Sequence, residues 1–247
     1  LNNKNVKILV LGAGKGKRMQ SDLPKVLVHL HGKPMLTHIR EAIADAHTET
    51  PIAIVGHQAE LVKSELGDTF LYALQNEQLG TGHAVSCAKG QCTDAEHIVV
   101  LSGDQPFISS ATIQNLITKH LASGAKITFT STEVPDFENW YNTFIAFGRI
   151  LRENGEVVGI REYRDATPEQ KLIKEVNAGC YIFDAQWLWK NLENIKNTNT
   201  QAEYYLTDLF GIAFKNGDKI ENIKIDPKEA LGANTKEDLE VLENLTT

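Results

Sequence analysis

The sequence has few cysteines, and no two of them have the spacing of a zinc or redox motif. Its three cysteines, Cys87, Cys92 and Cys180, are odd in number and form no C-x-x-C pair. This pattern argues against a disulfide framework and favours reduced thiols in a cytoplasm. We expect these side chains to be small buried hydrophobes.

Long apolar runs and an excess of positive charge are also absent. No stretch approaches the roughly 18 apolar residues of a membrane span, and the apolar run 6–11 leads straight into glycines, unlike a signal peptide. With 25 Lys and Arg against 32 Asp and Glu, the net charge is −7, which does not suit binding to a nucleic acid backbone. We therefore predict a cytoplasmic protein whose partners include neither a membrane nor a nucleic acid.

The sequence shows no internal repeat, no Gly/Ser-rich linker and no block of like charges. Its 247 residues, 42% of them hydrophobic, suffice for a sizeable core. One compact unit is therefore predicted rather than two tethered ones.

Short β-branched runs alternate with helical patterns in the first half of the chain. Buried strands are expected at 6–11, 52–55 and 98–101, with a crossover helix from about Pro34. Apolar side chains at 3.6-residue spacing between 113 and 121 predict another helix. This alternation is typical of an α/β fold with a Rossmann-like, doubly wound, mostly parallel sheet.

After about residue 127 the pattern loosens, and a mixed sheet is the expected continuation. Strand-like pieces lie at 127–132, 148–151 and 178–183. The run Thr167-Pro168-Glu169-Gln170 combines a capping box with proline at the first helical position, so a short helix is expected to begin there. Leucines on one face of 235–245 predict a terminal amphipathic helix.

A glycine-rich loop directly follows the first expected strand, with the sequence Gly12-Ala13-Gly14-Lys15-Gly16-Lys17-Arg18. Glycines after a parallel strand let main-chain amides approach a phosphate that a Cβ atom would exclude. A dinucleotide fingerprint would need glycine or alanine at Lys17, and a Walker A loop would need glycine five residues before a Lys-Ser/Thr pair. Neither motif fits, and a tight turn with surface lysines is the structural alternative.

Further charged residues are placed where a phosphate-binding site would need them. Proline stiffens the segment 21–25 and directs Lys25 back toward the loop. Arg18 and Lys25 together would neutralise a triphosphate, and charge stabilisation is the main catalytic contribution in such transfers. Asp104 follows a buried strand at the end where open parallel sheets bind ligands, although an aspartate there also suits a turn cap.

Short motifs are spread along nearly the whole chain. They are LGAGKGKRM at 11–19, SDLPKVL at 21–27, GKPM at 32–35, LQNEQLGTGHA at 74–84, GD at 103–104, FGRI at 147–150, EYRDAT at 162–167, EVNAG at 175–179, EYYLTD at 203–208 and GAN at 232–234. Together they resemble the sugar-phosphate nucleotidyltransferase (pyrophosphorylase) superfamily. Within it the likeness is strongest to the uridylyltransferase domain of bifunctional N-acetylglucosamine-1-phosphate uridylyltransferase/glucosamine-1-phosphate acetyltransferase.

The resemblance implies a nucleotide site beside the glycine-rich loop. In the family, the positions of Gln75 and of the pair 80–81 hold uracil, and an amide side chain suits a base that offers both donors and acceptors. A polar surface turn is the alternative for this segment, and His83 is expected to be a helix-start or packing residue. The residues assigned to the nucleotide are Leu11, Ala13, Gly14, Gly16, Lys25, Gln75, Gly80, Thr81 and Asp104.

The resemblance also implies one Mg²⁺ ion and a sugar site. Asp104 and Asn234 would share the metal, since both offer oxygen to a hard cation that keeps several waters. Gly148, Glu162, Asn177 and Asn234 would surround the sugar. On the residues alone, the alternatives are a helix cap for Asn234, a strand bend for Gly148, a solvated strand residue for Glu162 and a turn for Asn177.

These assignments divide the single domain 1–247 into a nucleotide-binding half, 1–125, a sugar-binding half, 126–234, and a C-terminal helix, 235–247. The bifunctional relatives continue into an acetyltransferase β-helix of hexapeptide repeats, which this sequence lacks, so acetyl transfer is not expected. Whether the chain acts alone or is a piece of a longer protein is left open. In the long segment 134–147, Trp140, Tyr141 and Phe144 are expected to form a lid over the sugar or a contact in a homo-oligomer.

The predicted reaction transfers UMP from UTP to N-acetylglucosamine 1-phosphate, giving pyrophosphate and the cell wall precursor UDP-N-acetylglucosamine. It is an in-line displacement assisted by Mg²⁺, with Arg18, Lys25 and Asp104 as catalytic residues. Two alternatives remain. One is the same chemistry on another hexose 1-phosphate or nucleotide, favoured by the long segment 134–147 and by Ser102, where this group carries tyrosine. The other is a non-catalytic sensor of nucleotide sugars.

Overall fold

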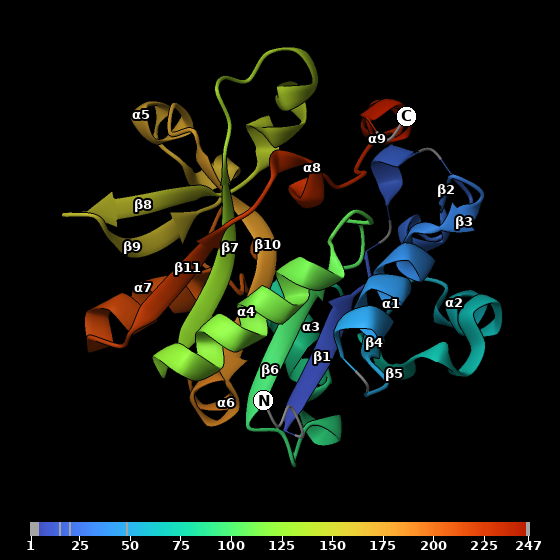
Figure 1. The fold of residues 1–247 in the computed structure, drawn as a ribbon, viewed down its shortest axis with the longest axis horizontal. Helices are drawn as coiled ribbons and strands as arrows, with labels where there is room; N and C mark the ends of the chain where they lie inside the picture. Colours follow the sequence, from blue (N-terminus) through green and yellow to red (C-terminus); the bar gives the residue numbers. More distant parts are fainter. Residues whose placement is uncertain (1–4, 15, 20, 48, 246–247) are drawn as a thin grey trace.

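One β-sheet runs through both halves of the chain in the computed structural model, which describes residues 5–14, 16–19, 21–47 and 49–245. Within these residues the main sheet has nine strands in the order β11-β7-β10-β6-β1-β4-β5, and β8 and β9 branch from β10 as a separate arm (Figure 1). The strands are β1 Val6–Leu11, β4 Ile52–Val55, β5 Leu71–Leu74, β6 His97–Ser102, β7 Ile127–Glu133, β8 Arg149–Glu153, β9 Glu156–Arg161, β10 Glu175–Asp184 and β11 Ile220–Lys224, and a small second sheet pairs β2 His29–Leu30 with β3 Lys33–Pro34.

The strand directions confirm the predicted α/β fold with a mostly parallel sheet that becomes mixed. Strands β5, β4, β1 and β6 run parallel to one another, and β11 runs parallel to β7. Strand β10 lies antiparallel between β6 and β7. The parallel strands β1, β4 and β6 are buried on both faces, which explains their continuous apolar runs.

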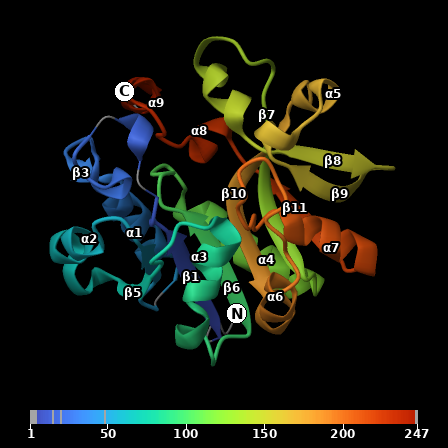
Figure 2. The ribbon, with the colours of Figure 1, turned by 180° about the vertical axis from the view of Figure 1, so that it is seen from behind.

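Helices cover both faces of the sheet. One face carries α1, α2 and α4, and the other carries α3, α6 and α7, as the front and back views show (Figure 1, Figure 2). Side chains of β1 alternate between the two layers, with Leu9 on one side and Ile8 and Val10 on the other. The helices are α1 Met35–Ala46, α2 Ala59–Leu66, α3 Thr81–Cys87, α4 Ser110–Ser123, α5 Pro168–Lys171, α6 Ala185–Leu192, α7 Asp208–Asn216, α8 Pro227–Ala230 and α9 Lys236–Leu245.

Most elements predicted from periodicity are present close to their predicted positions. The strands expected at 6–11 and 52–55 have these bounds as β1 and β4, and the terminal helix is α9. The predicted capping box begins α5, where Thr167 Oγ1 accepts from the amide of Gln170 at 3.3 Å. Strands β5, β9 and β11 were not predicted. The proposed division of the domain at 125/126 stays a prediction.

The expectation for the cysteines is confirmed for two of the three. Cys92 and Cys180 are buried, whereas Cys87 is only partly buried. Among the described residues, no helix combines the length and the apolar character that crossing a membrane requires.

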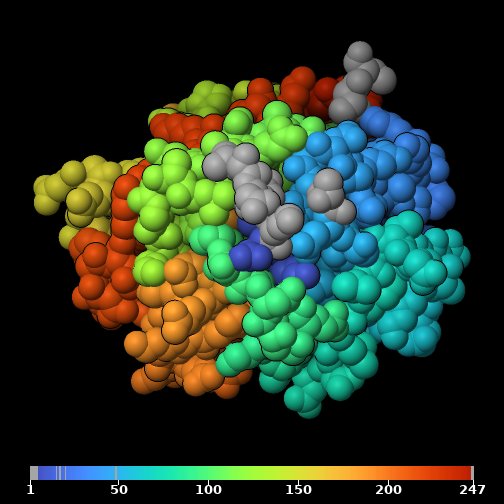
Figure 3. Space-filling view, turned by 60° about the horizontal axis from the view of Figure 1, so that its bottom comes forward, coloured from blue at the N-terminus to red at the C-terminus, as the bar shows by residue number. Residues whose placement is uncertain are grey.

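His97, a partly buried residue at the start of β6, meets His120, a buried residue on α4. The space-filling view shows the region of α4, in light green, beside that of α6, in orange (Figure 3). The rings of His97 and His120 lie edge to face with centroids 5.1 Å apart. His120 is 1% exposed, its Nδ1 lies 2.9 Å from Thr128 Oγ1, and its Nε2 has no hydrogen-bond partner among the described residues. Burial, together with the charge of His97, lowers the pKa of His120 from 6.5 to about 4.

We expect His120 to make the protein less stable in mild acid. Because its folded-state pKa lies below the ordinary value, the unfolded chain binds the proton more readily, and stability is lost as the pH falls from about 6.5 towards 4. The substitution His120→Asn should therefore reduce the loss of unfolding free energy between pH 7 and pH 5 by about 2 kcal/mol, as measured by urea denaturation.

The control is Thr128→Ala, which removes the hydroxyl beside His120 but no titrating group. This variant should lose stability by a similar amount at both pH values. An unchanged pH dependence in His120→Asn would contradict the assignment.

Candidate active site

The ends of β4, β1 and β6 come close together because one glycine follows β1 and another follows β6. The amide of Gly12 donates to Ile54 O at 2.8 Å, and the amide of Gly103 donates to Leu11 O at 2.8 Å. A Cβ atom at Gly103 would overlap that carbonyl oxygen. The glycines thus bring the glycine-rich loop next to Asp104.

Four predicted polar residues meet at this end of the sheet. Lys25, on the 3₁₀ turn Lys25–Leu27, forms an ion pair with Asp104 Oδ2 and donates to Asn234 Oδ1 at 2.8 Å. The guanidinium of Arg18 lies 3.5 Å from the same Asn234 oxygen. The structure therefore unites residues that are up to 216 positions apart in the sequence.

Helix α9 follows Asn234 and is capped by other residues, so the side chain of Asn234 is available to this site. The cap of α9 is a reciprocal pair: Thr235 Oγ1 accepts from the Asp238 amide at 3.1 Å, and Asp238 Oδ2 accepts from the amides of residues 234 and 235 at 2.9 Å. The alternative role of Asn234 as a side-chain helix cap is therefore wrong. The amide of Ala233 donates to Asp104 O at 3.1 Å and holds this segment against the end of β6.

The oxygen donors of Asp104 and Asn234 suit a small cation. Both converge on the ammonium of Lys25, so both oxygens already face one positive charge. Mg²⁺ commonly takes only one or two protein ligands and completes its shell with water and phosphate oxygens. Within the part of the chain that the structure describes, no group of three or more His, Cys, Asp or Glu side chains is arranged for a metal. The predicted Mg²⁺ site fits these residues and remains a prediction.

A cavity of about 210 Å³ lies beside the glycine-rich loop. Six of the residues predicted to bind the nucleotide line it, and Lys25 with Asp104 lies at the neighbouring strand end. The lining consists of Leu11, Ala13, Gly14, Gln75, Gly80 and Thr81, together with Gln78, Ala84 and Glu203. Gly16 has φ +57°, and a Cβ atom there would be 2.8 Å from the Cβ of Lys25, so this glycine lets the loop pack on the lysine. Lys15 lies outside the described residues.

The side-chain amide nitrogen of Gln75 has two hydrogen-bond partners. Gln75 is 3% exposed, and its Nε2 atom lies 3.1 Å from Gly80 O and 3.1 Å from His83 Nδ1. Both contacts use the amide nitrogen, so the amide oxygen is left as an acceptor on the residue that lines the cavity. The sequence did not reveal this role of His83, because eight positions separate the two residues and no spacing rule links a strand end to a helix start.

The loop around Gly80 is fixed by the distant segment 203–206. The amide of Tyr204 donates to Leu79 O at 2.7 Å, and that of Leu206 donates to Thr81 Oγ1 at 2.9 Å. Gly80 has φ +111°, and a Cβ atom there would lie 2.6 Å from Tyr204 O. Glycine is therefore required here both for its backbone conformation and for space.

Gly148 and Asn177, two of the four residues predicted to bind the sugar, lie where the arm joins the sheet. Gly148 O accepts from the amide of Asn177 at 2.8 Å, and Asn177 Nδ2 lies 2.6 Å from the hydroxyl of Tyr181. Asn177 Oδ1 accepts from the amide of Gly179 at 3.2 Å, so its side chain also shapes the bulge in β10. Asn177 lies within β10 and pairs with Ser131, so the alternative of a turn at this position is wrong. Its role toward a sugar remains a prediction.

Glu162 is a partly buried carboxylate, not the solvated strand residue of the alternative reading. Its Oε1 accepts from the Thr207 hydroxyl at 2.8 Å. Burial raises the pKa of this carboxyl in spite of that hydrogen bond. Glu162 and Arg18 line one cavity of about 200 Å³ with Tyr163 and Gln201, which connects the predicted sugar side to the phosphate loop.

A larger cavity, of about 660 Å³, lies between the arm, the end of α7 and β11. It contains none of the predicted site residues. We place the candidate site at the two smaller cavities, because the cations and the converging oxygen donors lie there and the chemistry depends on them.

The segment 134–147 is only partly buried, and Phe144 is the one fully buried member of its three predicted aromatic residues. For Trp140 and Tyr141, the lid or oligomer contact stays a prediction. Phe144 is fully buried in a cluster with Val134 and Val176, so the prediction that it forms a lid or an oligomer contact is wrong. The rings of Trp140 and Tyr141 stack with centroids 3.9 Å apart.

Arg149 holds this segment in place by hydrogen bonds to its carbonyl oxygens. It is 1% exposed and donates to the carbonyl oxygens of Phe144, Ile145, Phe147 and Lys171. A buried arginine with carbonyl partners has no signature in the sequence, and so this role was missed.

Residues 8–170 match the family model of the MobA-like NTP transferase domain. The chain belongs to this family. Membership confirms the predicted resemblance and the predicted enzyme class, a nucleotidyltransferase.

Relatives and solved structures agree with this family. The chain is 39% identical over 238 residues to "Bifunctional protein GlmU" of Desulfitobacterium hafniense, an alignment that covers 96% of the chain and 51% of the relative. It is 42% identical to the protein of that name from Brevibacillus brevis, with 92% and 49% covered. The chain thus spans about half the length of these relatives. A UDP-glucose pyrophosphorylase complexed with UDP-glucose has the same fold, with TM-score 0.76, 17% identity and 97% of both chains covered.

The requirement for glycine at position 80 can be tested by measuring protein stability. We expect Gly80→Ala to lower the unfolding free energy by about 1–3 kcal/mol, because the new Cβ atom forces a strained backbone conformation against Tyr204. Gly90→Ala is the matched control, since nothing lies within 4 Å of a Cβ atom there. Equal stability of the two variants in urea denaturation would contradict the expectation.

Proposed function

We propose that the chain transfers UMP from UTP to N-acetylglucosamine 1-phosphate, releasing pyrophosphate and forming UDP-N-acetylglucosamine. The observation that carries this proposal is the meeting of Arg18, Lys25, Asp104 and Asn234, of which Arg18 also lines the cavity that contains Glu162. Membership in the NTP transferase family and about 40% identity to relatives named GlmU support it. Substrates and metal are part of the proposal.

The reaction brings two phosphate-bearing anions together, and positive charge must offset their repulsion. Lys25 and Arg18 would contact the phosphates, and the main-chain amides of Gly14 and Gly16 would bind the triphosphate. An oxygen of the sugar phosphate attacks the α-phosphorus and pyrophosphate leaves. The nucleophile is already an anion, so no general base is needed.

Asp104 and Asn234 would hold Mg²⁺, which when bound neutralises phosphate charge as a Lewis acid. The ammonium of Lys25 now lies between these two oxygens. With Mg²⁺ and nucleotide present, this flexible side chain would turn to the phosphates. The protein thus contributes positioning and charge.

A second candidate keeps the chemistry and changes the sugar or the nucleotide. Ser102 favours it, because this small side chain donates to Gly179 O at 3.2 Å and places no ring beside Asp104. A sensor that binds without turnover is the remaining alternative. The assembled Lys25, Asp104 and Asn234 argue against it, since binding alone does not require a charged cluster at the reacting phosphate.

A grid of nucleoside triphosphates and sugar 1-phosphates, with Mg²⁺ or with a chelator, tests these alternatives through pyrophosphate release. The proposal expects the highest kcat/KM for UTP with N-acetylglucosamine 1-phosphate and loss of activity with chelator. A different preferred pair would establish the second candidate. Nucleotide binding without pyrophosphate release would establish the sensor.

We expect Asp104→Asn to lower kcat by on the order of 10² or more, the usual effect of removing one electrostatic stabiliser. The control, Asp94→Asn, removes an exposed carboxylate that lies 3.5 Å from Lys7 on another part of the surface. It should keep the wild-type kcat. Full Mg²⁺-dependent activity of Asp104→Asn would refute the assignment of Asp104.

His83 offers a test of base recognition. His83→Leu removes the acceptor that orients the Gln75 amide, and we expect it to raise KM for UTP by on the order of fivefold to tenfold. His83→Asn can present an oxygen near the Nδ1 position and should restore a KM close to that of the wild type. Steady-state kinetics at fixed sugar phosphate distinguishes these outcomes, and equal KM values in both variants would remove His83 from this role.

A further inference from the structure

The β8–β9 arm is joined to the main sheet by few backbone contacts. In the described structure β8 pairs with β10 at a single register position, Val176 with Arg149, next to the Gly148–Asn177 hydrogen bond. Beyond that point β8 pairs only with β9, and the two strands project away from β10 (Figure 1). The direction of the arm relative to the sheet must therefore be set largely by side-chain contacts.

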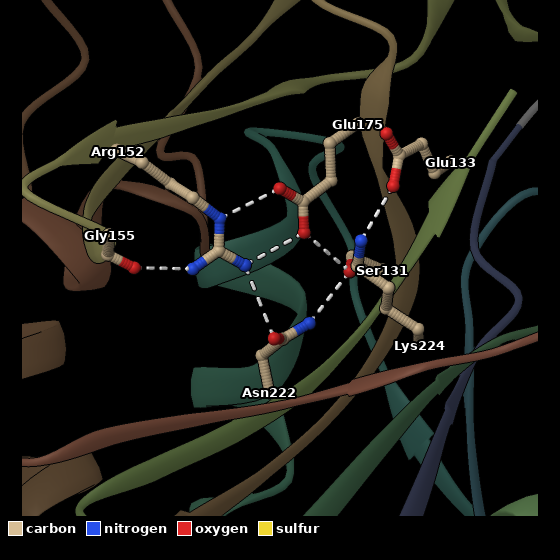
Figure 4. Close-up of polar contacts among 7 residues, drawn as sticks. All are labelled: Ser131, Glu133, Arg152, Gly155, Glu175, Asn222 and Lys224. Atoms are coloured by element: carbon tan, nitrogen blue, oxygen red, sulfur yellow. Dashed lines mark hydrogen bonds and ion pairs between the residues drawn. The ribbon is translucent and has the colours of Figure 1, made fainter. Parts of the chain in front are cut away.

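A ring of side-chain contacts joins the arm to three strands of the sheet (Figure 4). Arg152 on β8 donates through Nε to Glu175 Oε2 at 2.7 Å and through Nη2 to Glu175 Oε1 at 2.8 Å. Ser131 Oγ on β7 donates to Glu175 Oε1 at 2.9 Å and accepts from Asn222 Nδ2 on β11 at 2.7 Å. Arg152 Nη2 also reaches Asn222 Oδ1 at 3.2 Å, which closes the ring.

The ring has the features of a stiff contact. A two-pronged arginine–carboxylate pair fixes direction as well as distance. The Glu175 side chain is 13% exposed, so water weakens the pair less than it would a surface pair. The remaining Nη1 of Arg152 donates to Gly155 O in the arm's own turn at 2.9 Å, which ties the guanidinium to the arm's tip.

The residues proposed to bind the sugar lie at the ends of the strands that this ring connects. Gly148 immediately precedes β8, and Glu162 immediately follows β9. Asn177 lies two positions after Glu175 on β10. A change in the angle between arm and sheet would therefore shift Gly148 and Glu162 relative to Asn177.

We infer that Arg152 and Glu175 are positioning residues for the sugar 1-phosphate: their ring holds the arm at the angle that brings Gly148 and Glu162 to the sugar. This inference rests on the proposed function. The nucleotide cavity contains no residue of the arm, so the ring acts on one substrate and not on the other.

A matched control lies next to the ring. Lys224 on β11 and Glu133 on β7 form an ion pair of 2.6 Å that joins two strands of the sheet without touching the arm (Figure 4). Lys224→Gln therefore removes a neighbouring, more exposed ion pair and should leave the arm in place.

The experiment compares Arg152→Gln, Glu175→Gln and Lys224→Gln in the full chain. The two ring variants should raise KM for the sugar 1-phosphate by about tenfold, with kcat and KM for the nucleotide within twofold of wild type. The double variant Arg152→Gln/Glu175→Gln should match either single one, because each already opens the ring. Lys224→Gln should keep all three constants.

Ser131→Ala is the milder variant for the case that the ring variants do not fold, and it should raise the same KM by a smaller factor. Arg152→Lys keeps the charge but not the two-pronged geometry and should fall between wild type and Arg152→Gln. Equal changes in KM for both substrates, a loss of kcat alone, or kinetics like those of Lys224→Gln would overturn the inference.

Hydrogen exchange separates this inference from the proposed function. Amides of 149–161 should exchange faster in Arg152→Gln than in Lys224→Gln, whichever sugar phosphate the enzyme uses. If the wild type releases no pyrophosphate with any substrate pair, the proposed function fails. If the amides of 149–161 exchange equally fast in the two variants, the ring does not hold the arm in position, and the inference fails even if the proposed activity is present.

Discussion

The interaction on which the site depends is the contact of one lysine ammonium with two oxygens from distant parts of the chain. Lys25 lies between Asp104 and Asn234, and its side chain is 13% exposed. A charge this far removed from water needs such partners, because its loss of hydration would otherwise be costly. The tight junction of β1 with β6 at Gly103 and the return of the chain before α9 both serve to bring these groups together.

The protein handles phosphates although its net charge is −7. The positive charge is concentrated locally, because Arg18 and Lys25 both contact Asn234 at the end of the sheet. In the chain as a whole, acidic residues outnumber basic ones. Ionic interactions in such a site are stronger because little water screens the charges. A local cluster of this kind also requires no broad basic surface on the protein. Under the proposed function, selectivity for base and sugar would rest on neutral or shielded groups such as Gln75 and Glu162.

The sequence allowed good prediction of strands that are buried on both faces. Residues 6–11 and 52–55 have continuous apolar character, so their ends are marked by the first glycine or polar residue. Strand β11 is half-exposed along its length and β9 carries polar residues at both ends, so neither has a clear period. Site residues embedded in motifs could be named in advance. The partners of His83, Arg149 and Arg152 could not, because they depend on side-chain directions across strands.

The place of Asn234 along the chain has a consequence for synthesis on the ribosome. The glycine-rich loop, Lys25 and Asp104 are synthesised first, and the oxygen that completes the cluster follows at position 234, 130 residues after position 104. A nascent or prematurely terminated polypeptide can pair β1 with β6 and still lack the amide that faces Lys25. The charge cluster is thus assembled only after the segment 232–234 has been made, and a polypeptide that stops before it contains Lys25 and Asp104 but not the third member of the cluster.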